Sequence, residues 1–442
     1  MKIYLITIIL ICSSLYAQDS HYWNLQYGTK STLLGGAVIG SVSDLSATYY
    51  NPGAITLFSE PQLILSAKVY QYETIKIVDG AGVGKDLDYS SISPAPTFAA
   101  FNIGFDSTSD NKLAFSILTR QTMNFEFETR RVNNTVAEDE IIASGFSKTE
   151  KFDEMWFGFT FAHKYKQIIG FGATVYIAYR NQREDLLTTA QILDSVNQID
   201  NLFAKRKVEF SNYRALAKIG VGVNLMPITF GATITTPSIN LFGSGAYGYH
   251  NFLNIPQFSE LNIFESNYQE DIDSKYKTSW AIGLGAAYWA KTYTVHFSAE
   301  WYNAVKKYHP LEVAPLYSQS ADLFFTKEVT QALRSLINFG VGADYKLTKE
   351  VTIAASLTSD FSANDSNAPG NISQSKWDIY HLSGGAYFKA GSTEVTLGLS
   401  YSTGSDFIER LPYFSGDEIE NSLPSRSDVK FSRIKVLFGF VF

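Results

Sequence analysis

Hydrophobic and polar residues alternate at a period of two along much of the chain. In residues 111–127, Leu113, Phe115 and Ile117 begin one face that continues through Met123 to Phe127, while polar and small residues occupy the other face. Successive side chains of a strand point to opposite faces, so this pattern predicts a strand with one apolar and one wet face. Comparable stretches predict about fourteen strands near residues 62–77, 94–106, 111–127, 153–165, 167–181, 207–223, 227–236, 275–290, 292–303, 333–346, 350–359, 376–389, 393–403 and 429–442.

The connections between these strands alternate between short turns and long links. The long links are residues 78–93, 128–152, 182–206, 237–274, 304–332, 360–375 and 404–428. Transmembrane barrels place tight turns at the periplasmic rim and long loops at the outer rim. Beyond the N-terminus, no apolar run is long enough for a spanning helix. We therefore predict an all-β fold: a transmembrane antiparallel β-barrel in the bacterial outer membrane, with outer-membrane lipid as a partner.

The last strand supports this prediction. Apolar residues alternate down to a terminal aromatic residue: Ile434, Val436, Phe438, Phe440 and Phe442. Arg433 and Lys435 fall on the opposite side, which would face the lumen. Because such a terminal strand is typical of outer-membrane barrels, the barrel assembly machinery is an expected partner through Phe442.

Composition and charge exclude several classes of protein. The aromatic residues make up 15% of the chain, which also holds 31 glycines, as suits β structure with tight turns. The net charge of -7 leaves no basic stripe for nucleic acid. Residues 1–17, with Lys2 before an apolar core and Ala17 at the end, predict a signal peptide. This segment contains the single cysteine, Cys12, and the bulky Ile11 before it disfavours a lipoprotein signal.

Residues 18–60 lack strand periodicity and predict a plug, or hatch, inside a barrel formed by residues 61–442. The hatch contains small residues, an acidic Asp44, Ser46 with Ala47, and an Asn51-Pro52 turn followed by Gly53. Proline cannot donate to a strand ladder, so this segment is unsuited to the wall.

These hatch residues resemble the FadL/TodX family of outer-membrane transporters for long-chain fatty acids and aromatic hydrocarbons. The resembling residues are Gly35-Gly36-Ala37, Asp44, Ser46-Ala47 and Asn51-Pro52, with Gly53 where the family usually has alanine. The resemblance implies passive uptake of hydrophobic compounds, with long-chain fatty acids as the expected substrates. It also implies outer loops that collect the substrate, a lumen site that holds it, and a hatch movement or third-strand kink that releases it sideways. Regular alternation over 111–127 predicts a third strand without such a kink.

Two long links contain many apolar residues for water-exposed loops, and these predict a substrate-collecting groove. Link 182–206 has near-helical spacing that includes Leu193, Val196 and Phe203, whereas link 237–274 is rich in aromatic residues. The alternative is that both links pack together and close the barrel mouth. The collecting residues predicted here are Leu193, Val196, Phe203, Phe242, Phe252, Phe258 and Phe264.

Four cations on predicted lumen-facing positions are candidates for contact with a fatty-acid carboxylate: Arg120, Arg180, Arg214 and Lys218. The alternative is that these cations pair with acidic residues of the lumen.

Enzyme and metal motifs are weak. The glycine-rich residues 79–86 lack the glycine and the Ser or Thr of a phosphate loop. The six histidines show no ligand spacing, and the acidic residues 270–273 suit a solvated loop better than a calcium site. We expect no cofactor, no metal and no enzymatic activity, and a catalytic alternative would require a serine and a histidine that converge. The main alternative function is a structural or adhesive barrel that binds a surface partner through its long loops.

Overall fold

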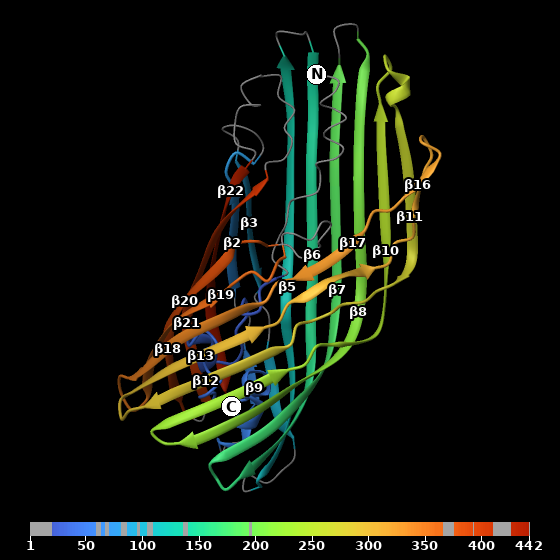
Figure 1. Ribbon diagram of the computed structural model, residues 1–442. Helices are drawn as coiled ribbons and strands as arrows, with labels where there is room; N and C mark the ends of the chain where they lie inside the picture. The colour runs from blue at the N-terminus through green and yellow to red at the C-terminus, as the bar shows by residue number, and fades with distance from the viewer. Residues whose placement is uncertain are drawn as a thin grey trace.

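The computed structural model describes residues 20–58, 63–66, 70–80, 86–94, 98–103, 109–135, 140–193, 197–365, 375–391, 393–409 and 426–441. Within these ranges almost all regular structure is strand, and one antiparallel sheet contains nearly all of it (Figure 1). No helix in the described ranges is both long enough and apolar enough to cross a membrane. The predicted signal peptide, residues 1–17, lies outside the described residues.

The main sheet consists of eighteen strand segments: β1 (Leu63–Ser66), β2 (Tyr70–Ile77), β3 (Leu87–Pro94), β4 (Phe98–Ile103), β5 (Asn111–Thr135), β6 (Glu140–Tyr165), β7 (Ile169–Leu193), β8 (Ile199–Leu225), β9 (Ile228–Thr235), β10 (Ile239–Asn254), β11 (Ile263–Asp273), β12 (Ala281–Trp289), β13 (Tyr293–Tyr302), β18 (Leu336–Lys346), β19 (Val351–Asp360), β20 (Asp378–Ala390), β21 (Thr393–Glu409) and β22 (Arg426–Val441). The sheet is closed, because β22 pairs with β21 on one side and with β1 and β2 on the other. Closure pairs the strand edges around the barrel, as hydrocarbon requires, except that β3 forms no ladder with β5 among the described residues.

These segments form fourteen strands, as the sequence predicted. Four strands are each divided into two segments that follow one another in the chain: β1 with β2, β3 with β4, β9 with β10, and β11 with β12. The two segments of a divided strand share neighbours; for example, β9 and β10 both pair with β8. Short elements complete the described chain: α2 (Lys30–Leu33), α3 (Ala47–Tyr50), η1 (Pro52–Thr56), η2 (Ser259–Leu261), and the small sheets of β14 (Val305–Leu311) with β17 (Val329–Leu333) and β15 (Leu316–Ser318) with β16 (Leu323–Phe325).

Side-chain alternation places apolar residues on the outside of the barrel, as expected for a transmembrane barrel. On β6, Phe157, Phe159 and Phe161 are exposed, whereas the intervening residues face inward. The prediction for the last strand is confirmed over its described part, because Ile434 and Val436 are exposed while Arg433 and Lys435 are buried. The terminal Phe442 lies outside the described residues.

The extent of the long outer links was predicted wrongly. β5, β6, β7 and β8 span 25 to 27 residues each, and with β10 and β11 they form a tall wall that rises above the rest of the barrel (Figure 1). Residues 182–206 are therefore mostly strand, and their near-helical spacing does not produce a helix. Above the membrane both faces of a strand can carry polar residues, so the period-two signal weakens although the backbone ladder continues.

The regular third strand was also a wrong prediction. The pairing of β5 with β6 shifts register between Thr119 and Gln121, which leaves Arg120 as a β-bulge. A bulge inserts one extra residue and reverses the faces beyond it. Even-numbered residues such as Leu118 face inward before the bulge, whereas Met123 and Phe125 face inward after it.

The N-terminal segment, residues 20–58, is enclosed by the barrel. It contacts inward-facing residues on opposite sides of the wall: Gly53 meets β7 and β8, Gly40 meets β12, and Leu33 meets β20 and β21. In Figure 1 this segment is drawn in blue within the lower part of the barrel. It therefore occupies the lumen at the end of the barrel that has the short turns.

Candidate functional site

The predicted Asn51-Pro52-Gly53 turn fixes the N-terminal segment to the wall. The side-chain oxygen of Asn51 accepts a hydrogen bond from the N–H of Gly53, and Pro52 occupies the first position of η1, where a missing N–H costs nothing. The Asn51 amide donates to the backbone oxygens of Ile39 (2.9 Å) and of Val221 on β8 (3.0 Å). One buried side chain therefore links two parts of the segment to the barrel.

Glycines on the wall allow this turn to approach closely. A Cβ added at Gly53 would lie 2.4 Å from the backbone oxygen of Gly170 on β7 and 2.6 Å from that of Gly220 on β8. A Cβ at Gly220 would in turn lie 2.3 Å from the Asn51 side-chain oxygen. These distances are far below van der Waals contact, so both surfaces require glycine here. This contact accounts for the glycine at position 53.

Asp44 and Ser46 stabilise the start of α3. One oxygen of Asp44 accepts hydrogen bonds from the Ser46 backbone N–H (2.8 Å) and from its hydroxyl. Burial raises the pKa of Asp44, against the opposing effects of these hydrogen bonds and of Lys30. The predicted hatch residues therefore form one connected set, from Asp44 to Gly53.

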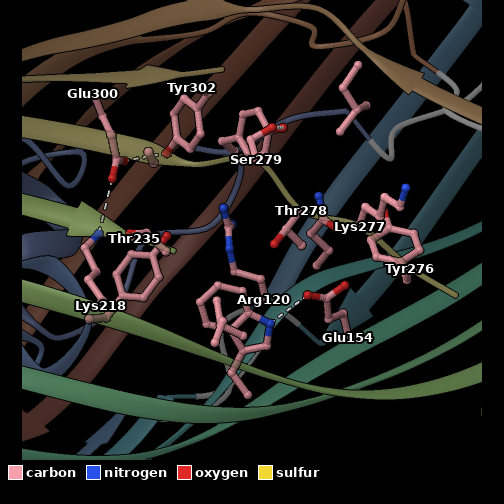
Figure 2. Close-up of a pocket in the computed structure, with 17 residues that line it drawn as sticks. Arg120, Glu154, Lys218, Thr235, Tyr276, Lys277, Thr278, Ser279, Glu300 and Tyr302 are labelled. Carbon is pink, nitrogen blue, oxygen red and sulfur yellow. Dashed lines mark hydrogen bonds and ion pairs between the residues drawn. The ribbon is translucent and has the colours of Figure 1, made fainter. Parts of the chain in front are cut away.

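A cavity lies between this segment and the barrel wall (Figure 2). It contains about 670 Å³ of space between atoms, part of it continuous with solvent. Aromatic rings form much of its surface: Tyr22, Tyr49, Trp156, Tyr276 and Tyr302. The predicted cations Arg120 and Lys218 also line it. The cavity is thus apolar over much of its surface with a few charged groups, as is common for small-molecule sites.

Two of the four predicted cations share one carboxylate. Glu154 lies 2.9 Å from Arg180 and 2.5 Å from Arg214, and it also accepts a hydrogen bond from the Trp156 indole at 2.6 Å. Both guanidinium groups stack over the ring of Tyr276, at 4.4 and 4.5 Å from its centroid. All three charged residues are buried, so this pairing offsets the cost of removing them from water.

A third predicted cation, Lys218, also has an acidic partner. Its amino group lies 3.3 Å from Glu300, and Figure 2 shows this ion pair across the cavity. Glu300 also accepts hydrogen bonds from the indole of Trp23 (3.0 Å) and the hydroxyl of Tyr302 (2.5 Å). For Arg180, Arg214 and Lys218, the structure therefore agrees with pairing to acidic residues of the lumen.

Arg120 differs from the other three cations. It lies at the β-bulge of β5, its guanidinium stacks over Trp156 (5.5 Å) and Tyr49 (5.8 Å), and it is 6% exposed. Within the described residues it forms no ion pair, and its Nη1 atom has no hydrogen-bond partner. A buried guanidinium without a carboxylate is costly, and a ligand carboxylate in the cavity would reduce that cost.

Several solved structures share this architecture. A Pseudomonas aeruginosa FadL homologue aligns with a TM-score of 0.58 at 14% identity, over 96% of this chain and 99% of its own. The P. putida toluene transporter TodX aligns at 0.60 and 11% identity, over 94% and 98%, and the Ralstonia pickettii toluene transporter TbuX at 0.56 and 11%, over 95% and 99%. This chain has the FadL/TodX fold. At such identities the likeness is one of fold, and the sequence matches no family model and no curated protein.

Most of the predicted collecting residues lie on the tall wall. Phe203 on β8, Phe252 on β10 and Phe264 on β11 are direct cross-strand neighbours and form a row on the outer face. Phe242 lies lower on β10 against Tyr213, and Phe258 lies exposed beside η2. Leu193 ends β7, and Val196 lies outside the described residues.

The aromatic residues that line this cavity were not predicted. Tyr49 follows the small-residue motif of the N-terminal segment, and Trp156 lies next to predicted outward positions. Tyr276 precedes β12, and Tyr302 ends β13. In the sequence, only their position on the inward face of a strand distinguishes these residues. That position can be assigned only when the strand boundaries are known. Within the described ranges, no group of three His, Cys, Asp or Glu residues is placed to hold a metal ion.

Proposed function

We propose that this protein is an outer-membrane channel for the uptake of hydrophobic compounds that carry a carboxylate, with long-chain fatty acids as the substrate class. The observation that carries the proposal is the aromatic cavity in the lumen, with the buried Arg120 on its surface that forms no ion pair among the described residues. The FadL homologue, TodX and TbuX share the fold, and the last two are named as toluene transporters. In this chain, the positive charge of Arg120 favours a substrate that carries a carboxylate over a neutral hydrocarbon.

Two apolar clusters on the inward face of the tall wall support the proposal. At the top of the wall, Ile192, Leu202 and Leu253 cluster on the inward face, opposite the outer phenylalanine row. Lower on the wall, Phe210 and Tyr247 cluster with Leu311 of β14, and this cluster also contains Tyr276 of the cavity. A hydrophobic chain that descends along these two clusters to Arg120 would pass the buried, inward-facing Glu184 and Asn251 that lie between them.

The wall next to the cavity offers a route sideways. β4 pairs with β5 over residues 98–103, next to the Arg120 bulge, whereas β3 forms a ladder with β2 and, among the described residues, none with β5. Instead, the hydroxyl of Tyr89 on β3 bonds to the backbone oxygen of Asn124 on β5. Release between β3 and β5 requires no ladder to break, and small movements of the N-terminal segment would expose this gap to the cavity.

The test is fatty-acid binding to the detergent-folded full chain. Arg120→Gln removes the charge and keeps a polar side chain, and we expect it to weaken binding of radiolabelled oleate by about tenfold, or 1.4 kcal/mol, which is typical of a charge-assisted hydrogen bond. Methyl oleate, which has the same chain and no charge, should bind equally to both proteins.

Arg183→Gln is the matched control, because Arg183 is half exposed and pairs with Asp185 outside the cavity. It should leave both affinities unchanged. If oleate fails to bind a folded barrel, the substrate class is wrong. If oleate binds equally to Arg120→Gln, the placement of the carboxylate is wrong.

One observation favours the alternative of an adhesive barrel. The tall wall carries exposed aromatic residues on its outer face, including Phe242, Phe264 and Tyr268. An adhesin would retain partner binding at cells after Arg120→Gln and lose it when these three residues are replaced by serine. A channel would show the opposite dependence in fatty-acid uptake.

A further inference from the structure

A serine, a histidine and an aspartate form a hydrogen-bonded chain where the N-terminal segment meets β13 and β18. The hydroxyl oxygen of Ser41 lies 2.7 Å from Nδ1 of His296, and Nε2 of His296 lies 2.8 Å from a carboxylate oxygen of Asp344. Because the carboxylate accepts, Nε2 carries the hydrogen and Nδ1 is left to accept the Ser41 hydroxyl proton. This is the relation that activates a serine hydroxyl as a nucleophile, with the two ring nitrogens exchanged relative to the usual triad.

The histidine is fixed and the serine is accessible. His296 and Asp344 are buried on the neighbouring strands β13 and β18, and the ring of Trp289 meets the imidazole edge-on at 6.0 Å. Ser41 is half-buried, and its backbone N–H donates to Val38. A general base held in one orientation next to an open hydroxyl loses little entropy when a substrate arrives.

Ser41 and His296 line a second pocket, which shares no lining residue with the lumen cavity. It contains about 830 Å³ of space, part of it continuous with solvent. Val38, Val42 and Trp289 supply apolar surface. The pocket extends to exposed residues of the turn between β18 and β19, so it opens at the end of the barrel with the short turns.

We propose that Ser41 is the nucleophile of an ester-hydrolysing site in this pocket, with carboxylic esters of medium acyl chains as its substrate class. Ser41 Oγ bonds to the ester carbonyl carbon while its proton moves to His296 Nδ1. The carbon–oxygen bond of the ester breaks, and the alcohol leaves with that proton. Water then cleaves the acyl–serine, so one ester and one water give one acid and one alcohol. The acyl chain packs against Val38, Val42 and Trp289.

A second serine, histidine and aspartate in the barrel wall show a similar arrangement and serve as a comparison. Ser402 lies 2.7 Å from Nδ1 of His381, whose Nε2 lies 3.6 Å from Asp360. These three residues are at most 1% exposed and line neither pocket. A polar network of this kind can therefore serve structure alone, and access to a pocket is what distinguishes Ser41.

The experiment treats the detergent-folded full chain with a fluorophosphonate probe and maps the adduct by mass spectrometry. We expect one adduct on Ser41 and none on Ser402. Ser41→Ala should abolish labelling and the hydrolysis of 4-nitrophenyl butyrate, whereas Ser402→Ala should leave both unchanged. Absence of a Ser41 adduct in barrels with the gel mobility of the folded state would falsify the proposal, and so would full hydrolysis by Ser41→Ala.

Asp344 acts through His296 and is a positioning residue. Asp344→Asn should slow the labelling of Ser41 by about tenfold, because the imidazole loses the partner that fixes its tautomer. It should also change the pH dependence of the labelling rate. A purely structural Asp344 would alter the thermal stability of the barrel and leave the pH profile of Ser41 labelling as in the wild type.

Discussion

At the scale of single residues, the lumen contains buried charged side chains, most of which pair with a group of opposite charge. Glu154 holds Arg180 and Arg214, and Glu300 holds Lys218, so three of the four predicted cations are paired with a carboxylate, two of them with the same one. Pairing of this kind fixes the shape of a polar interior more than it adds stability. Arg120 stands apart because its neighbours are aromatic rings, and this difference makes it the candidate for substrate contact.

His21 gives the docking of the N-terminal segment a dependence on pH. Burial lowers the pKa of His21 below its ordinary 6.5, against the opposing effect of Asp360. The undocked segment then binds the proton more readily, so the docked state is fully favoured above pH 6.5. Below pH 6.5 it loses up to about 1.4 kcal/mol for each pH unit, until the pH passes the lowered pKa of the docked His21. Hydrogen exchange of residues 20–27 should accelerate as pH falls from 6.5 to 5, after correction for the intrinsic rate.

His21→Gln isolates this effect, because it retains hydrogen-bonding capacity and cannot be protonated. Its corrected exchange should depend less on pH than that of the wild type. Identical profiles for the two proteins would show that another group controls the docking.

At the scale of elements, the tall wall has two different faces. Neighbouring residues on β8 and β10 point in opposite directions: Leu202 and Leu253 face inward, and Phe203 and Phe252 face outward. The proposed path along the two apolar clusters uses the inward face, whereas the sequence predicted that the phenylalanines collect the substrate.

Paired substitutions separate these two possibilities. Leu202→Ser with Leu253→Ser should lower oleate uptake by cells about fivefold, which corresponds to the loss of about 1 kcal/mol of apolar contact along the wall. Phe203→Ser with Phe252→Ser should have little effect. The reverse result would assign collection to the outer row and remove the inward path from the proposal.

The sequence predicted strand number, closure and the outward faces, because lipid imposes a strong period-two pattern on membrane-spanning residues. It failed at the wall above the membrane, where 182–206 satisfies its backbone by pairing β7 with β8 although its side-chain pattern resembles a helix. It also missed the bulge at Arg120, because apolar residues before and after the bulge alternate without a visible gap. The hatch motif was recognisable, but the aromatic cavity depends on inward faces that only the register reveals.

At the scale of the whole molecule, the barrel encloses its own N-terminal segment. Inward-facing polar residues such as Asn212, Ser298 and Ser402 surround a lumen that this segment partly occupies. A closed barrel of fourteen strands is wide enough to conduct water and ions unless its lumen is filled.

Deletion of residues 20–58 should therefore raise the single-channel conductance in planar bilayers by about tenfold, because a filled lumen becomes an aqueous one. The wild-type chain, folded in the same detergent, is the control. Unchanged conductance in a folded deletion variant would place the barrier elsewhere, and the β14–β17 sheet would then be the next element to remove.

The close packing of Gly53 against Gly170 and Gly220 also bears on how this chain can diverge. A larger residue on either surface collides with the other, so neither surface can change alone. Among related chains, the length and size of the Asn51–Gly53 turn and the glycine positions of β7 and β8 should vary together. Correlated substitution at these distant sites would then record the fit between the wall and its N-terminal segment, whichever substrate each relative carries.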